Sequence, residues 1–143
     1  MKVREILKAK GTKVVTAGPD EPVRTLVRRF REERIGALVV VSEAGVPVGL
    51  VSERDVVYGL AVHGERTLGM RADELMSGEL IGCAPDDSLK QVMTTMTVRR
   101  HRHLPVLDEG KLVGIVSIGD VVKHRLDEME LETNVLRDYV IAR

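Results

Sequence analysis

The sequence predicts a mixed α/β (α+β) fold built from two copies of one small unit, related by a pseudo-twofold axis. First, a phrase occurs twice: residues 49–56 read Gly-Leu-Val-Ser-Glu-Arg-Asp-Val, and residues 114–121 read Gly-Ile-Val-Ser-Ile-Gly-Asp-Val. Second, the apolar face of the helix before the first copy recurs 66 residues later (89 − 23), at Leu89, Val92, Met93 and Met96. A unit this small buries little core alone, so we expect the copies, each a three-stranded sheet with flanking helices, to pack sheet against sheet.

Composition supports a globular protein and excludes several functions. Apolar residues make up 43% and charged residues 31% of the 143 residues, as in a soluble domain. Lys+Arg and Asp+Glu both number 22, so the net charge is zero, which argues against nucleic acid and anionic membranes as partners. The single cysteine, Cys83, permits no internal disulfide, and the sequence has neither a membrane-spanning apolar run nor a signal-like start. We therefore expect a cytoplasmic protein.

The first unit begins with alternating helical and strand patterns. A short helix is expected over residues 3–8 and a strand over 13–16, which Gly18-Pro19-Asp20 ends. The next helix starts at Asp20 or Glu21. Its apolar residues follow i, i+3, i+4, i+7 spacing, which predicts one buried face: Val23, Leu26, Val27 and Phe30.

The same unit continues with a hairpin and a second helix. Residues 35–41 form an apolar, β-branched run that is typical of a buried strand, and residues 46–51 form the return strand. A helix then begins at Ser52, with three apolar residues expected to face inward: Val56, Val57 and Leu60.

The pattern restarts after a linker. We expect a first repeat over residues 1–62, a linker over 63–70, a second repeat over 71–126 and a carboxyl-terminal helix over 127–143. The last helix has an apolar stripe with no counterpart after the first repeat, which we expect to pack on the body or on a second subunit: Leu131, Val135 and Tyr139.

Two agreeing copies, each ending in Val-Gly-(Leu/Ile)-Val-Ser-x-x-Asp-Val, resemble the tandem cystathionine β-synthase-type (CBS) domain pair, or Bateman module. The chain is most similar to small stand-alone prokaryotic CBS-pair proteins. The resemblance implies a regulatory, non-enzymatic module that binds an adenine nucleotide (AMP, ADP, ATP or NAD(H)) or S-adenosylmethionine between its repeats. It also implies a homodimer formed through helices, and a regulated partner protein.

The resemblance also implies where the ligand binds. The carboxylates that hold the ribose fall on Asp55 and Asp120, and the accompanying hydroxyls fall on Ser52 and Ser117. Arg54 is placed to reach a phosphate, whereas the second repeat has Gly119 there.

The remaining implied contacts surround the adenine. Backbone contacts are expected from the second strand of each unit, at Gly36, Ala37, Arg102 and His103. Further contacts are expected from the first strand, at Thr16, Ala17, Gly82 and Cys83. The threonine of the first repeat is replaced by Gly82 in the second.

Structural alternatives exist for several of these residues. Ser-x-x-Asp before an apolar run is also a helix capping box, and a ligand-independent interaction scaffold would use both copies only as caps. Residues 99–103 contain three arginines and two histidines, which suit either a phosphate or the carboxyl end of a helix. His101, His103 and Cys83 are too sparse to predict a metal, and no nucleophile–base pair indicates catalysis.

Overall fold

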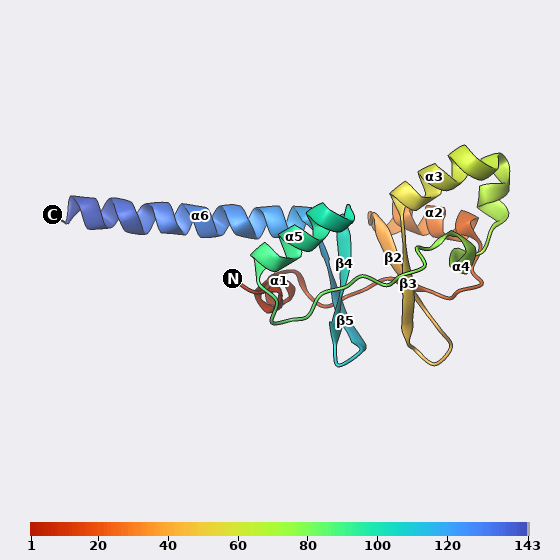
Figure 1. Cartoon of the computed structure of the whole chain (residues 1–143), viewed down its shortest axis with the longest axis horizontal. Helices are drawn as coiled ribbons and strands as arrows, with labels where there is room; N and C mark the ends of the chain where they lie inside the picture. The colour runs from red at the N-terminus through yellow and green to blue at the C-terminus, as the bar shows by residue number, and fades with distance from the viewer. Residues whose placement is uncertain (143) are drawn as a thin grey trace.

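The computed structural model describes residues 1–142, which form two small sheets covered by helices (Figure 1). The first half of the chain contains α1 (Val3–Lys10), β1 (Thr16–Ala17), α2 (Val23–Glu33), β2 (Ala37–Val41), β3 (Pro47–Ser52), α3 (Glu53–His63) and the 3-10 helix η1 (Gly64–Gly69). The second half contains α4 (Ala72–Leu75), α5 (Leu89–Arg99), β4 (His103–Asp108), β5 (Lys111–Ser117) and α6 (Ile118–Ile141). The expected linker over residues 63–70 is thus largely the 3-10 helix η1.

The first sheet has three strands in the order β1-β2-β3, as the sequence predicts. β1 pairs in parallel with β2, and β2 pairs antiparallel with β3 through a turn at Gly45, which adopts a positive φ of 78°. In this register Ala37 lies opposite Ser52, so the end of β3 that begins α3 sits beside the start of β2.

Within residues 1–142 the second sheet has only two strands, β4 and β5, where a third was expected. Cys83 forms a single parallel bridge to Val106 in the place of that third strand. The cause is Pro105, which stands where the first repeat has Val39. The Val39 N–H donates to the Val15 carbonyl at 3.3 Å, but a proline has no N–H to donate. The parallel pairing therefore stops after one residue.

The two sheets face each other, which confirms the predicted sheet-to-sheet packing. Ala37, Val39 and Leu50 of the first sheet are at most 7% exposed, and Leu112 and Ile115 of the second sheet pack against them. This shared cluster joins two larger cores, one in each half. Neither half therefore buries its inner sheet face without the other.

The leading helices are exchanged between the halves. Val3, Ile6 and Leu7 of α1 belong to the core of the second half, and Ala72 of α4 belongs to the core of the first. Figure 1 shows α1 beside β5 and α6, and α4 beside the first sheet. Because the connecting segments cross in both directions, the halves are joined covalently as well as by packing.

Each exchanged helix, or the residue directly after it, packs closely against a glycine of the opposite sheet. A Cβ on Gly49 would lie 2.5 Å from Met76 Sδ, which follows α4, and a Cβ on Gly114 would lie 2.6 Å from Leu7 Cδ2 of α1. The two glycines occupy equivalent places in the repeated phrase. A side chain at either position would push against Met76 or Leu7, so glycine gives these two side chains room to pack.

Four residues that periodicity placed inward are instead exposed: Val27, Val57, Leu60 and Met93. Their helices α2, α3 and α5 lie, with α6, along one side of the sheets (Figure 1). Helical spacing identifies apolar positions but does not distinguish a face against the sheet from one turned outward. The remaining predicted core positions, including Leu26 and Met96, are buried.

The last helix is longer than either repeat requires. α6 extends well beyond the body of the molecule (Figure 1), and Leu131, Val135 and Tyr139 are 59–65% exposed. The first alternative for this stripe, packing on the body, is therefore wrong. Across residues 1–142, no helix is both long enough and apolar enough to cross a membrane.

Candidate functional site

A cavity of about 450 Å³ lies where α3 of the first half meets the start of β4 in the second. This volume falls in the range of roughly 300–1,000 Å³ that is usual for small-molecule sites. Six predicted site residues line it: Gly36, Ser52, Arg54, Asp55, Arg102 and His103. The structure therefore gathers these six around one hollow between the repeats.

Ser52 and Asp55 form the floor of the cavity and the start of α3. Ser52 Oγ accepts a hydrogen bond from the Asp55 N–H at 3.3 Å, and Asp55 Oδ2 accepts from the Ser52 N–H at 2.8 Å. These bonds make a complete capping box, as the structural alternative predicted. The box uses Oδ2 alone, and within residues 1–142 no hydrogen bond reaches Oδ1 of Asp55. Capping therefore leaves this carboxylate with an acceptor for a ligand.

Four arginines also line the cavity. Arg99, Arg100 and Arg102 line the cavity with Arg54, whose Nη1 donates to the Arg100 carbonyl at 3.3 Å across the two halves. Against these four cations stand the carboxylates of Glu53 and Asp55. An excess of arginine beside a free carboxylate oxygen suits a ligand that carries both anionic groups and hydroxyls.

His103 is held between Gly36 and the acidic floor. A Cβ on Gly36 would lie 3.0 Å from His103 Cε1 and 2.9 Å from Glu53 Oε1, so the glycine lets both side chains approach. Burial lowers the pKa of His103 below its usual value, although the nearby Glu53 carboxylate opposes that shift. His103 is therefore a neutral ring at pH 7, and a cationic contact to phosphate is better assigned to the arginines.

The equivalent position in the second repeat is built differently. Ser117 and Asp120 form the same capping box, with Asp120 Oδ2 accepting from the Ser117 N–H at 2.8 Å. Lys10 Nζ also donates to this oxygen, at 2.7 Å. Desolvation acts to raise the pKa of Asp120, but the hydrogen bonds from Lys10 and Ser117 together leave it lowered. Asp120 is thus an ion-paired carboxylate, unlike Asp55.

The other predicted contacts lie outside the lining of this cavity. Thr16 and Ala17 pair with Val39 and Val40, which follow the lining residue Gly36 by three and four residues, and Ala37 is buried beside Ser52. The second-repeat residues Gly82, Cys83, Ser117 and Asp120 are likewise absent from the lining. Their place as ligand contacts remains a prediction.

Cys83 cannot act as a thiolate. Burial, with a smaller effect from Asp87, raises the pKa of its thiol to about 12. Among residues 1–142, no three His, Cys, Asp or Glu side chains lie close enough to hold a metal ion.

Sequence reasoning missed some of the lining, of which Tyr58 and Ser77 are the most informative. Tyr58 lies one helical turn after Asp55 and is 61% exposed. Its i+3 spacing from Asp55, in a chain with only two tyrosines, was the available signal. Ser77 carries no such signal because it follows the short helix α4.

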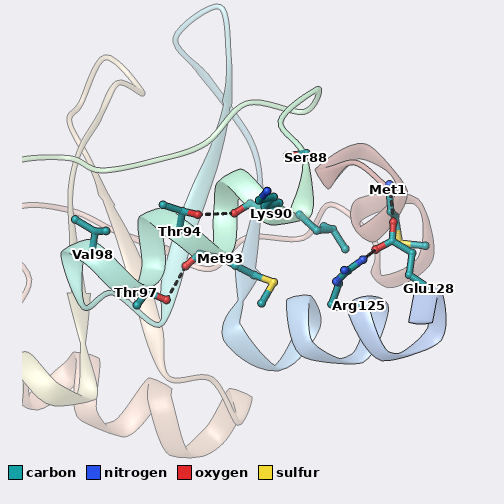
Figure 2. Close-up of a pocket in the computed structure, with 10 residues that line it drawn as sticks. Met1, Ser88, Lys90, Met93, Thr94, Thr97, Val98, Arg125 and Glu128 are labelled. Carbon is teal, nitrogen blue, oxygen red and sulfur yellow. Dashed lines mark hydrogen bonds and ion pairs between the residues drawn. The ribbon is translucent and has the colours of Figure 1, made fainter. Parts of the chain in front are cut away.

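A second, larger hollow of about 620 Å³ lies on the outer helical side, between α5 and α6 (Figure 2). Its lining includes Met93, Thr94, Thr97 and Val98 of α5. Figure 2 shows Glu128 between Arg125 and the amino group of Met1. The Glu128 carboxylate accepts a hydrogen bond from Arg125 Nη1 at 2.8 Å and one from the Met1 amino group at 2.7 Å. None of the predicted ligand residues lies here.

The repeated unit, the paired sheets and the cavity between them define a tandem CBS module. The CBS domain family model matches residues 3–62 and 72–127, so the chain belongs to the CBS domain family.

Individual relatives cover most of the chain. The chain is 31% identical over 115 residues to the CBS domain-containing protein YhcV of Bacillus subtilis. The match covers 80% of this chain and 81% of that protein. Its fold matches the CBS-domain protein ATU1752 from Agrobacterium tumefaciens with a TM-score of 0.84, at 39% identity over 87% of this chain and 92% of that one. The CBS domain protein PAE2072 from Pyrobaculum aerophilum, solved with AMP, matches with a TM-score of 0.78 at 25% identity, over 93% and 99% of the two chains.

Proposed function

We propose that this CBS pair is a non-enzymatic regulatory module that binds an adenine nucleotide in the cavity at Asp55 and relays its occupancy to a partner protein. The observation that carries the proposal is that Asp55, whose cap uses Oδ2 alone, and four arginines line one cavity. AMP, ADP, ATP and NAD(H) share the adenosine phosphate that this arrangement suits.

Each part of the nucleotide has a matching group. The two ribose hydroxyls donate to Asp55, because a carboxylate accepts strong charge-assisted hydrogen bonds. The phosphate lies against Arg54 and Arg102, whose guanidinium groups bind phosphate oxygens in pairs. Tyr58, at the mouth of the cavity, offers the adenine a flat aromatic surface.

The location of the cavity suggests how binding is relayed. Arg54 already joins the halves through its bond to the Arg100 carbonyl. A phosphate at this point engages side chains from both halves, so the ligand favours whichever arrangement of the halves brings them together. The AMP complex of the relative PAE2072 supports the ligand class.

A homodimer formed through the outer helices completes the proposal. Val27, Val57, Leu60 and Met93 are apolar and at least 37% exposed on that side. A second copy would cover them and fill the hollow between α5 and α6 (Figure 2). Light scattering should report twice the chain mass for wild type and a shift toward monomer for Met93→Glu. A wild-type monomer at micromolar concentration would contradict the dimer.

The nucleotide proposal is tested by thermal shift with AMP, ADP, ATP and NAD(H), using 2′,3′-dideoxy-AMP as the matched control. We expect stabilisation of about 2.7 kcal/mol at ligand 100-fold above its Kd. The dideoxy analogue retains the adenine and the phosphate but lacks the hydroxyls that Asp55 binds, so it should stabilise far less. Equal shifts with AMP and its dideoxy analogue would contradict the assigned role of Asp55.

A ligand-independent scaffold is the second candidate, and the two complete capping boxes favour it. Under this function Ser52→Ala and Ser117→Ala each cost about 1 kcal/mol, equally with and without nucleotide. An absence of any thermal shift with the four nucleotides would favour the scaffold.

A cytoplasmic location is part of the same proposal. The unpaired Cys83 thiol suits a reducing compartment.

A further inference from the structure

The repeated Ser-x-x-Asp motif gives the chain two equivalent places for a ribose, yet among residues 1–142 only one of the two carboxylates has an ion-pair partner. Asp55 has no ion-pair partner within residues 1–142. Asp120 is paired with Lys10, whose ammonium lies 2.7 Å from Oδ2. The side chains of Lys10 and Asp120 are 34% and 23% exposed, so water screens this pair only in part.

Two bonds fix the position of the lysine. Besides Asp120, Lys10 Nζ donates to the Ile115 carbonyl at 3.1 Å, so the ammonium lies between the end of β5 and the start of α6. Lys10 and the cap share Oδ2, so what the ammonium removes is the unpaired charge of Asp120, and a ribose hydroxyl would donate there to a carboxylate that is already neutralised. Lys10 thus pairs at Asp120 with the negative charge that stays unpaired at Asp55 among the described residues.

The difference follows from the lengths of the exchanged helices. α1 has eight residues and ends at Lys10, whereas its counterpart α4 has four and ends at Leu75. The extra turn of α1 brings Lys10 over the start of α6. In the first half, the chain has already left the helix, and uncharged Ser77 lines the cavity instead.

At two more positions the second repeat has a glycine in place of a side chain that is expected to contact the ligand in the first repeat. Gly119 stands where Arg54 provides a phosphate contact. Gly82 stands where the first repeat has Thr16, and a Cβ at Gly82 would lie 2.8 Å from the Pro105 carbonyl oxygen. A threonine is therefore excluded at Gly82, whereas a Cβ at Gly119 would meet only Ser117 Oγ, at 3.6 Å.

We infer that the chain binds one nucleotide, at Asp55, and that Lys10 closes the equivalent position at Asp120. The inference rests on the proposed function, because it specifies how many of the two positions bind the ligand. The chain carries its own cation on the second carboxylate, which makes one position a ligand site and the other a structural contact between α1 and α6.

The test is calorimetric titration of the full chain with AMP, comparing wild type with Lys10→Met and Lys8→Met. Methionine keeps most of the aliphatic length of lysine and removes the charge. Lys8 is the matched control, because it lies on the same helix and is exposed. We expect one AMP per chain for wild type and Lys8→Met, and two per chain for Lys10→Met.

Two additional variants locate the new site. Lys10→Met with Asp120→Asn should return to one AMP per chain. Lys10→Met with Gly119→Arg should bind the second AMP about tenfold more tightly than Lys10→Met alone, because an arginine restores a charged phosphate contact.

The outcomes separate this inference from the proposed function. Two AMP per chain in wild type, or one per chain in Lys10→Met, would overturn the role of Lys10 and leave nucleotide binding intact. No binding of any adenine nucleotide by wild type would overturn the proposed function itself.

Discussion

The two halves of this chain are alike in their cores and different at their rims. Leu38 and Leu104 occupy the same position 66 residues apart (104 − 38), and both are completely buried. The residues at the ligand positions differ between the repeats. Arg54 corresponds to Gly119, and Asp55, which has no ion-pair partner among residues 1–142, corresponds to the ion-paired Asp120. A duplication keeps the packing that both copies need for folding. Single changes at the rim then make two equivalent positions unequal.

The largest effect should test the likeness of the cores. Leu38→Ala and Leu104→Ala each remove a fully buried side chain, so each should lower the free energy of unfolding by about 2–5 kcal/mol. Urea denaturation measures both. We expect the two losses to agree within about 1 kcal/mol. A large loss in one variant only would break the comparison and show that one half dominates the stability.

A smaller effect should come from the glycines beside the exchanged helices. An alanine at Gly49 or Gly114 places a methyl group against Met76 or Leu7, at a cost of about 1 kcal/mol because these side chains can partly shift. Gly114→Ala should cost more, since leucine is less flexible than methionine. Urea denaturation checks the order, and Gly78→Ala is the control, as nothing lies within 4 Å of its Cβ position.

The smallest effect concerns His103, which lines the cavity beside the arginines and has no histidine counterpart in the first repeat. Because burial lowers its pKa in the folded chain, the unfolded chain takes up a proton first as the pH falls below about 6.5. Stability contributed by the neutral ring is therefore present above that pH and is lost below it. His103→Gln should flatten the decline in unfolding free energy between pH 7 and 5, and exposed His63→Gln is the control. If unfolding free energy fell equally steeply with pH in wild type and His103→Gln, the lowered pKa of His103 would be contradicted.

The sequence predicted the arrangement of elements because each signal is local. The apolar run at residues 37–41, the hairpin at Gly45 and the cap at Ser52 each act over a few residues, and their repetition predicted two facing sheets. The expected third strand of the second sheet does not form because Pro105 lacks the backbone N–H that Val39 donates in the first sheet. That substitution was visible in the sequence, but its effect depends on a register that only the folded chain sets.

The site was predictable in its motif residues and not in their surroundings. Asp55, Ser52 and Arg54 lie together because they are neighbours at the start of one helix. Lys10 lies 110 residues from Asp120, and nothing near it repeats a motif. Its contact depends on the exchange of α1 into the second half, which the pattern of residues 3–10 does not reveal. The pairing between distant segments was therefore the information that the sequence lacked.

The most direct test of the account is the affinity for AMP of Asp55→Asn and Asp120→Asn, measured by calorimetry against wild type. Asparagine keeps an oxygen acceptor for the cap and removes the charge that the ribose hydroxyls need. We predict that Asp55→Asn weakens binding about 10–100-fold, the worth of a hydrogen bond to a charged group, while Asp120→Asn leaves the affinity unchanged within about twofold. Equal losses in the two variants, or a loss in Asp120→Asn alone, would contradict the claim that the ligand is held at Asp55.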